Sequence, residues 1–100
     1  MEPKIGKYYY HYKHDDNDVC DHAYFIDDLA YDLENDREVL LYKPLYELVI
    51  DGIEVKNGVR SIVNFTDMVT REGKTFARFS KVTDPEIISK LESKKKELYG

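Results

Sequence analysis

Closely spaced turn signals restrict this chain to short β-strands over most of its length. Between residues 30 and 82, polar or glycine-containing turn segments separate runs of apolar and aromatic residues. The turn signals are Asn35-Asp36, Asp51-Gly52, Asn57-Gly58 and Glu72-Gly73-Lys74. Asn, Asp and Gly accept the positive φ that tight hairpin turns require. Short strands repeated at this spacing predict a mainly β protein, a small barrel or roll of antiparallel strands.

The strongest predicted strand is residues 38–43, since its apolar run is continuous enough to be buried on both faces. Two strands are expected before it, at 7–13 and 23–31. In the second of these, Asp27 and Asp28 predict a bulge or a sheet edge. After Pro44 we expect a helical turn at 64–68 and strands at 48–50, 53–55, 59–63, 69–71 and 75–82.

The last residues change character and predict an appended helix. Thr83 or Asp84 is suited to cap a helix that has Pro85 at its first position. The apolar stripe that would pack on the strands is Ile87, Ile88, Leu91 and Leu98. A chain of 100 residues forms one domain with a small core. We therefore expect a single domain, 1–100, made of a β core at 6–82 and a helix at 84–99.

Charge is distributed unevenly, and this limits the classes of partner. The formal net charge is −5, and the segment from Asp15 to Glu38 carries ten acidic side chains and one basic side chain, Arg37. Such a block repels a phosphate backbone, so the composition does not favour a general nucleic-acid binder. A local basic face remains compatible with the sequence.

Location is constrained by what the sequence lacks. No apolar run approaches the roughly 18 residues of a spanning helix, and no segment reads as a signal peptide. The single cysteine, Cys20, excludes an internal disulfide and fits a reducing compartment. We therefore expect a cytoplasmic protein that does not associate with membranes. We expect a monomer or a weak dimer, because charges at Asp27 and Asp28 discourage pairing of strand edges.

Four segments between residues 6 and 79 follow a recognisable pattern. They are His11-Tyr12-Lys13 after Tyr9; residues 30–46 with Glu34, Tyr42, Leu45 and Tyr46; Val59-Arg60 followed by Phe65, Asp67 and Val69; and Gly73-Lys74 followed by Arg78-Phe79. Together they resemble the DUF1653 family, small bacterial and phage domains of uncharacterised function. The resemblance implies an SH3-like roll and a set of positions, and it implies no reaction.

The chain also departs from the family pattern. An acidic segment, residues 15–22, lengthens the loop after the His-Tyr-Lys element, and residues 48–57 form an extra hairpin. Asp32 stands near the position of a common His, Gly58 replaces an aromatic residue, and Ser61 replaces a proline. The helix from Pro85 lies beyond the shared region.

The best candidate site is a surface of aromatic and cationic side chains. Aromatic faces beside guanidinium groups stack a planar ligand and hold a carboxylate or phosphate bidentately. The candidate ligand-binding residues are Tyr9, His11, Tyr12, Tyr46, Arg60 and Arg78, with Tyr42 close to them in the pattern. The alternative is structural: Tyr42, Leu45 and Phe65 belong to the core, and Arg60 pairs with Glu34, Glu47 or Asp67.

Metal and catalytic signatures are weak, and we predict no metal, no cofactor and no catalytic residue. Zinc-compatible donors occur at His11, His14, Cys20 and His22, without the paired spacing of a zinc site. The run from Asp15 to Asp18 lacks the glycine and distal glutamate of an EF-hand loop. Nothing in the sequence fixes Cys20 against His22, and no glycine-rich phosphate loop or Gly-x-Ser-x-Gly motif is present.

The sequence thus favours a recognition module without catalytic activity, for an unknown ligand or protein partner. One alternative is a nucleic-acid-associated accessory domain that uses Arg60, Arg78 and Lys13 while the acidic loop faces away. The other is a small hydrolase or nucleotide-processing enzyme, which the missing catalytic constellation makes the weakest of the three.

Overall fold

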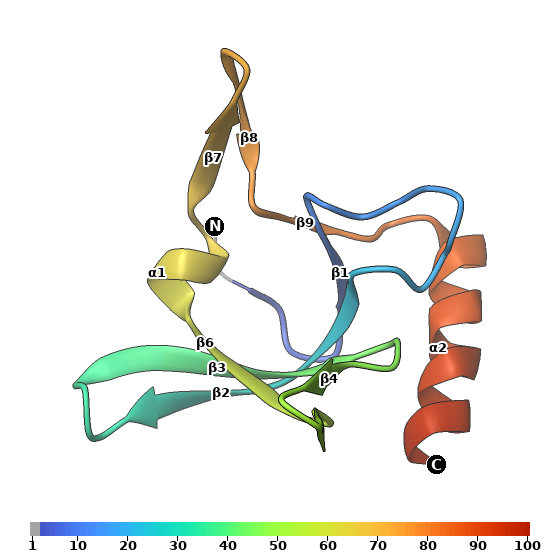
Figure 1. Ribbon diagram of the computed structural model, residues 1–100, viewed down its shortest axis with the longest axis horizontal. Coiled ribbons are helices and arrows are strands. Elements are labelled where there is room, and N and C mark those ends of the chain that lie inside the picture. The colour runs from blue at the N-terminus through green and yellow to red at the C-terminus, as the bar shows by residue number, and fades with distance from the viewer. Residues whose placement is uncertain (1–2) are drawn as a thin grey trace.

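A five-stranded antiparallel sheet forms the body of the protein in the computed structural model, which describes residues 3–100 (Figure 1). Its spatial order is β6-β3-β2-β1-β9. These strands are β1 (Tyr8–His11), β2 (Ala23–Asp32), β3 (Arg37–Pro44), β6 (Gly58–Ser61) and β9 (Phe79–Lys81). Separate hairpins join β4 (Val49–Ile50) to β5 (Ile53–Glu54) and β7 (Met68–Arg71) to β8 (Lys74–Ala77). The helices are α1 (Ile62–Phe65) and α2 (Pro85–Tyr99). The predicted mainly β roll with a C-terminal helix is confirmed.

Three of the four predicted turns are confirmed by their backbone conformation. Positive φ values occur at Asp36, at Asp51 with Gly52, and at Glu72 with Gly73. The prediction of a turn at Asn57-Gly58 is wrong, because Gly58 is the first residue of β6 and pairs with Tyr42 across the sheet. A Cβ atom at position 58 would lie 2.7 Å from Cζ of Tyr42. A side chain at position 58 would therefore displace the Tyr42 ring, so glycine serves here to make room for that ring and not to form a turn.

Two strand predictions are wrong at points where the structure ends one strand and begins a different element. The strand expected at 59–63 ends at Ser61, whose hydroxyl accepts a hydrogen bond from the Asn64 N–H at 3.2 Å and caps α1. The helical turn consequently lies at 62–65 and not at 64–68. The strand expected at 75–82 is broken at Arg78, because β8 pairs with β7 whereas β9 pairs with β1. The first strand ends at His11, two residues earlier than predicted.

The predicted irregularity in β2 is a bulge. The register between β2 and β3 shifts between Ile26 and Asp28, which leaves Asp27 outside the ladder. The Asp27 carboxylate accepts a hydrogen bond from Nζ of Lys43 at 2.6 Å. A sheet edge is present as well: β1 pairs only with residues 23–25 of β2, so in the described residues Asp28 to Asp32 pair with β3 alone. The charges at positions 27 and 28 therefore lie where one side of β2 becomes a sheet edge.

Side chains alternate between two faces of the sheet, and each face has its own core. The inner face is defined by the buried cluster Tyr9, Tyr24, Ile26, Leu40, Phe65 and Phe79, with Tyr42 and Tyr46 packed against it. The outer face is defined by the buried cluster Tyr8, Ala23, Leu45, Val82 and Leu91. In β3, Val39 and Leu40 are both buried, as predicted for that strand, whereas Leu41 and Tyr42 are only partly buried.

Helix α2 covers the outer face, where it lies beside the loop between β1 and β2 (Figure 1). Asp84 caps it as predicted, accepting a hydrogen bond from the Glu86 N–H at 2.9 Å. Leu91 is buried under the helix, and the Tyr99 hydroxyl donates to the Pro44 carbonyl at 2.6 Å. No helix in residues 3–100 is long and apolar enough to cross a membrane. Because α2 occupies the outer face, the candidate residues must be sought on the inner face.

Candidate functional site

The His11 ring lies at the centre of the candidate site, at the end of β1. Alternation along β1 places Tyr9 and His11 on the inner face and Tyr8 on the outer face. The His11 ring centroid lies 4.4 Å from that of Tyr12, 5.0 Å from that of Phe79 and 5.7 Å from that of His22. Residues from β1, β9 and the β1–β2 loop therefore meet at one imidazole.

His11 is neutral at pH 7 and presents a hydrogen-bond donor. Burial lowers its pKa to about 4, with smaller Coulomb contributions from Arg60, His22, Arg78 and Lys13. The Lys13 backbone N–H donates to Nδ1 of His11 at 3.2 Å. The proton of the neutral ring is consequently on Nε2, which makes that atom a donor.

Arg60 projects from β6 onto the aromatic side chains of the inner face. Its guanidinium carbon lies 5.0 Å from the Phe79 centroid and 5.9 Å from the Tyr42 centroid. Nη1 donates to Oδ1 of Asn64 at 2.6 Å. The structural alternative, in which Arg60 pairs with Glu34, Glu47 or Asp67, is wrong, because no carboxylate of residues 3–100 comes within 4.0 Å of this guanidinium. Nε is buried without a hydrogen-bond partner.

Arg78 occupies the break between β8 and β9. Its backbone N–H donates to the Asp67 carbonyl at 3.1 Å, and its Nη2 lies 3.6 Å from Oδ2 of the same residue. The Asp67 carboxylate is 56% exposed, so solvent screens this ion pair. Nε of Arg78 is also buried without a partner. The guanidinium charge is therefore only partly compensated.

Sequence reasoning missed the role of Asp21, which orients the His22 ring. Oδ2 of Asp21 accepts hydrogen bonds from Nδ1 of His22 and from the Asp15 backbone N–H, both at 2.9 Å. The bond to His22 lowers the pKa of Asp21. His22 has a φ of 48°, a left-handed conformation that is unusual for a residue other than glycine. Only the Asp-His dipeptide was visible in the sequence, and a dipeptide does not reveal a strained backbone.

Tyr46 closes the opposite side of the cluster. Its ring centroid lies 5.8 Å from that of His22, and its hydroxyl shares a 2.5 Å hydrogen bond with that of Tyr24. Burial raises the pKa of both tyrosines. His11, Tyr46, Arg60 and Arg78 are thus gathered on one side of the sheet, as four of the six predicted ligand-binding residues.

The other two predicted residues, Tyr9 and Tyr12, lie differently. Tyr9 is 3% exposed and belongs to the core, so its placement on the surface was wrong. Tyr12 stays next to His11 but also contacts the β7–β8 hairpin, where Nη2 of Arg71 donates to its hydroxyl at 3.2 Å. Strand alternation groups Tyr9 with His11, but only packing against Phe65 determines that Tyr9 is covered.

The zinc-compatible donors divide between the two faces. His14 stacks on Tyr10 at 3.6 Å, and Cys20 packs with the outer cluster beneath α2, whereas His11 and His22 belong to the inner side. Among residues 3–100, no three His, Cys, Asp or Glu side chains gather as a metal site. Burial raises the pKa of the Cys20 thiol, opposite to the shift of an activated nucleophile.

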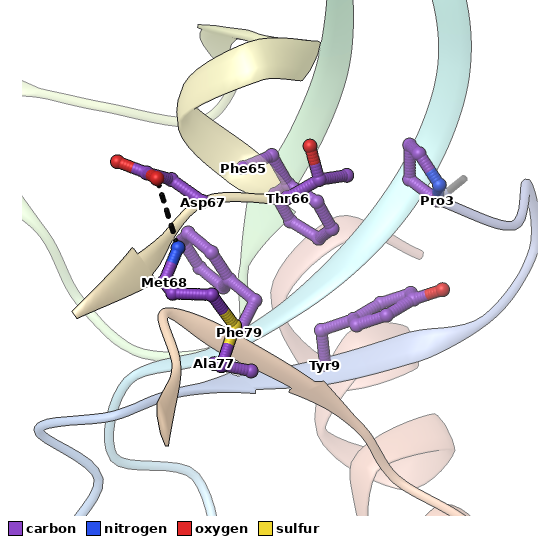
Figure 2. Close-up of a pocket in the computed structure, with 8 residues that line it drawn as sticks. All are labelled: Pro3, Tyr9, Phe65, Thr66, Asp67, Met68, Ala77 and Phe79. Atoms are coloured by element: carbon purple, nitrogen blue, oxygen red, sulfur yellow. Dashed lines mark hydrogen bonds between the residues drawn. The ribbon is translucent and has the colours of Figure 1, made fainter. Parts of the chain in front are cut away.

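An apolar pocket of about 250 Å³ adjoins this cluster (Figure 2). Its walls are Pro3, Tyr9, Phe65, Thr66, Asp67, Met68, Ala77 and Phe79. The Phe65 and Phe79 rings stack with centroids 4.3 Å apart. Phe79 also contacts His11 and Arg60, so a single ring separates the apolar pocket from the cationic side chains.

The titration of His11 is a direct test of this environment. The folded-state pKa, about 4, is below the ordinary value of 6.5, so between these values the unfolded chain binds a proton that the folded chain does not. The contribution of His11 to stability is therefore complete above pH 6.5 and decreases as pH falls towards 4. NMR titration of the His11 ring should give a midpoint near 4 in the folded protein and near 6.5 in concentrated urea. Equal midpoints in the two states would contradict the proposed burial and cationic surroundings.

Comparison with known proteins identifies a family and nothing further. The family model described as "Protein of unknown function (DUF1653)" matches residues 7–81, three quarters of the chain. The match includes His11, Tyr46, Arg60 and Arg78 and excludes α2. No curated protein and no solved structure matches the chain.

Proposed function

The chain belongs to the DUF1653 family, whose function is unknown, and from that premise we propose that it is a recognition module for an anionic ligand. The ligand would be held by the recognition face, which consists of His11, His22, Tyr46, Arg60 and Arg78. The proposal concerns binding and includes no catalysed reaction.

The observation that carries the proposal is the uncompensated charge of Arg60. The chain has 20 acidic and 15 basic side chains, yet none of the carboxylates of residues 3–100 pairs with this guanidinium. A partly buried cation without a counter-ion is unfavourable, because desolvation is not offset by attraction. A bound anion would supply the missing partner, and a guanidinium holds carboxylates and phosphates bidentately.

Aromatic side chains give the recognition face a second means of binding. The His11 and Tyr12 rings are neighbours, and the Tyr46 ring lies beyond His22; all four residues are only partly buried. Flat partly exposed rings stack on planar groups of a ligand. An anion that carries an aromatic ring would therefore use both properties of the face.

A small hydrolase is the second candidate, and the Asp21–His22 pair is the observation that favours it. The pair orients one imidazole and leaves its Nε2 without a hydrogen-bond partner in the described residues. However, three side chains that could act as nucleophiles all have a raised pKa: Cys20, Tyr24 and Tyr46. An activated nucleophile requires a lowered pKa or an adjacent base. Recognition is therefore better supported than catalysis.

A nucleic-acid-associated role would use Arg60, Arg78 and Lys13 on the same side of the domain. The acidic segment from Asp15 to Glu38 counts against it, since Asp21 in that segment contacts His22 directly. For location, the single cysteine fits a reducing compartment, and we place the domain in the cytoplasm.

Replacing Arg60 by alanine tests the proposed function. The probes are benzoate and phenyl phosphate, which combine an aromatic ring with an anionic group, titrated into the ¹⁵N-labelled protein. Binding should shift the amide signals of His11, Tyr46 and Arg60, and Arg60→Ala should weaken it about tenfold or more, because it removes a charge-assisted hydrogen-bond donor.

Arg37→Ala is the matched control for a change of net charge. Arg37 lies at the tip of the β2–β3 hairpin, where its Nε is 3.4 Å from Oδ2 of Asp32. This variant should bind both probes like the wild type. If neither probe binds, or if Arg37→Ala weakens binding as much as Arg60→Ala, the proposed function is wrong.

A further inference from the structure

Three residues of the recognition face, on three different elements, provide hydrogen-bond donors. They are the Nε2–H of His11 at the end of β1, the Arg60 guanidinium on β6 and the Arg78 guanidinium between β8 and β9. The His11 ring centroid and the guanidinium carbon of Arg60 each lie 5.0 Å from the Phe79 centroid, and Arg78 directly precedes Phe79, which pairs with His11 across the sheet. The three donors belong to separate parts of the chain that meet around Phe79.

We infer that the anionic group recognised here is a phosphate monoester on a small aromatic molecule. The inference rests on the proposed anion-binding function and specifies its ligand class. A carboxylate has two coplanar oxygens, which one guanidinium satisfies. A phosphate monoester has three terminal oxygens directed to different sides, so it can accept from all three donors at once.

The balance of charge agrees with this choice. Arg60 has no carboxylate partner in residues 3–100, and Asp67 compensates Arg78 only through a solvent-exposed contact of 3.6 Å. The face therefore carries positive charge that its own carboxylates compensate only in part. A phosphate monoester carries about −1.5 to −2 at pH 7. It matches that charge better than a carboxylate does.

His11 should report directly on the bound group. Its ring is neutral because it is partly buried among Arg60, His22, Arg78 and Lys13. The only carboxylates on these neighbours are Asp21, bonded to His22, and Asp67, facing Arg78. A dianion placed beside the ring opposes the cations and favours protonation of the imidazole. Binding of a phosphate monoester should therefore raise the pKa of His11.

A small phosphate compound fits the surroundings better than the phosphates inside a nucleic-acid strand. The loop before β2 holds four acidic residues, and one of them, Asp21, contacts the recognition face through His22. A strand with many phosphates would have to run past this loop and would be repelled. A single phosphate group with one ring avoids that repulsion.

The decisive experiment compares phenyl phosphate, benzoate and pentathymidylate with and without a 5′-phosphate, using the full chain. Phenyl phosphate should bind about tenfold or more tightly than benzoate, since one more charge-assisted hydrogen bond forms. It should also shift the NMR titration midpoint of His11 upward from about 4, and benzoate should shift it less. The unphosphorylated oligonucleotide should bind more weakly than phenyl phosphate.

Two substitutions separate the donor of His11 from its ring. His11→Phe keeps an aromatic ring without a donor and should reduce the preference for phenyl phosphate over benzoate about tenfold. His11→Gln restores an N–H donor and should recover most of that preference. Amide spectra of both variants show whether the fold is intact. Equal preferences in the wild type and in a folded His11→Phe would overturn the role of His11.

The outcomes distinguish this inference from the proposed function. If both anions bind with equal affinity and both require Arg60, the function stands and the phosphate inference is wrong. If neither anion binds, both are wrong. If the unphosphorylated oligonucleotide binds more tightly than phenyl phosphate, the ligand is a phosphodiester chain and the inferred small monoester is overturned.

Discussion

Leu40→Ala is expected to lower the free energy of unfolding by about 2–5 kcal/mol, because it opens a cavity at a site that cannot collapse. Leu40 is 0% exposed in β3, between β2 and β6, and it packs in the cluster of the inner face. Domains of this size have total stabilities of about 5–15 kcal/mol. The variant should therefore lose a large fraction of its stability.

Urea denaturation followed by circular dichroism measures this loss. The midpoint should move to lower urea while the slope stays unchanged, since the surface exposed on unfolding is nearly the same. Leu33→Ala is the matched control, because Leu33 is 83% exposed at the tip of the β2–β3 hairpin. It should change stability by less than about 0.5 kcal/mol. If the two variants lost similar amounts of unfolding free energy, Leu40 would not be a buried core residue of the inner face.

Leu91→Ala should lower the free energy of unfolding by a similar amount, about 2–5 kcal/mol, because it opens a cavity in the outer cluster and not in the inner one. Leu91 is 0% exposed and is the residue of α2 buried in the outer cluster. Its loss removes the main apolar contact between the helix and the outer face. Lys90→Ala, on the exposed side of the same helix, should leave stability almost unchanged.

The two core variants should differ in which face they disturb. In Leu40→Ala the amide signals of His11, His22 and Arg60 should shift, because Leu40 lies under the inner face that holds them. In Leu91→Ala those signals should stay in place while signals of α2 move. Comparable shifts at His11 in both variants would contradict the separation of the two cores.

The features that could be predicted from the sequence depend on neighbouring residues. Asp51-Gly52 and Gly73 form turns because Asp and Gly accept positive φ, and Glu72 adopts a φ of 52° beside Gly73. Asp84 and Pro85 start α2 by the local chemistry of a helix N-terminus. The candidate residues His11, Tyr46, Arg60 and Arg78 were also predicted, and the structure places them on one side of the sheet. Their role in binding stays a prediction.

The errors concern residues whose role depends on distant contacts. Gly58 resembled a turn residue, but it is conformationally ordinary and makes room for the Tyr42 ring. Tyr9 was predicted to lie on the surface, but it is buried against the Phe65 ring. The alternative in which Arg60 pairs with a carboxylate fails because its guanidinium lies on the Phe79 ring and donates to Asn64. None of these contacts has a signal in the spacing of the sequence.

The sequence by itself determined where the chain turns, where its last helix begins and which family it belongs to, because these follow from local backbone preferences and from residue pattern. Only the tertiary structure decided that α2 covers the outer face, that Arg60 has no carboxylate partner in residues 3–100, and that His11 is neutral. Burial and Coulomb energy depend on distances through space between residues far apart in the chain. The electrostatic character of the recognition face therefore exists only once β1, β6 and β9 have come together.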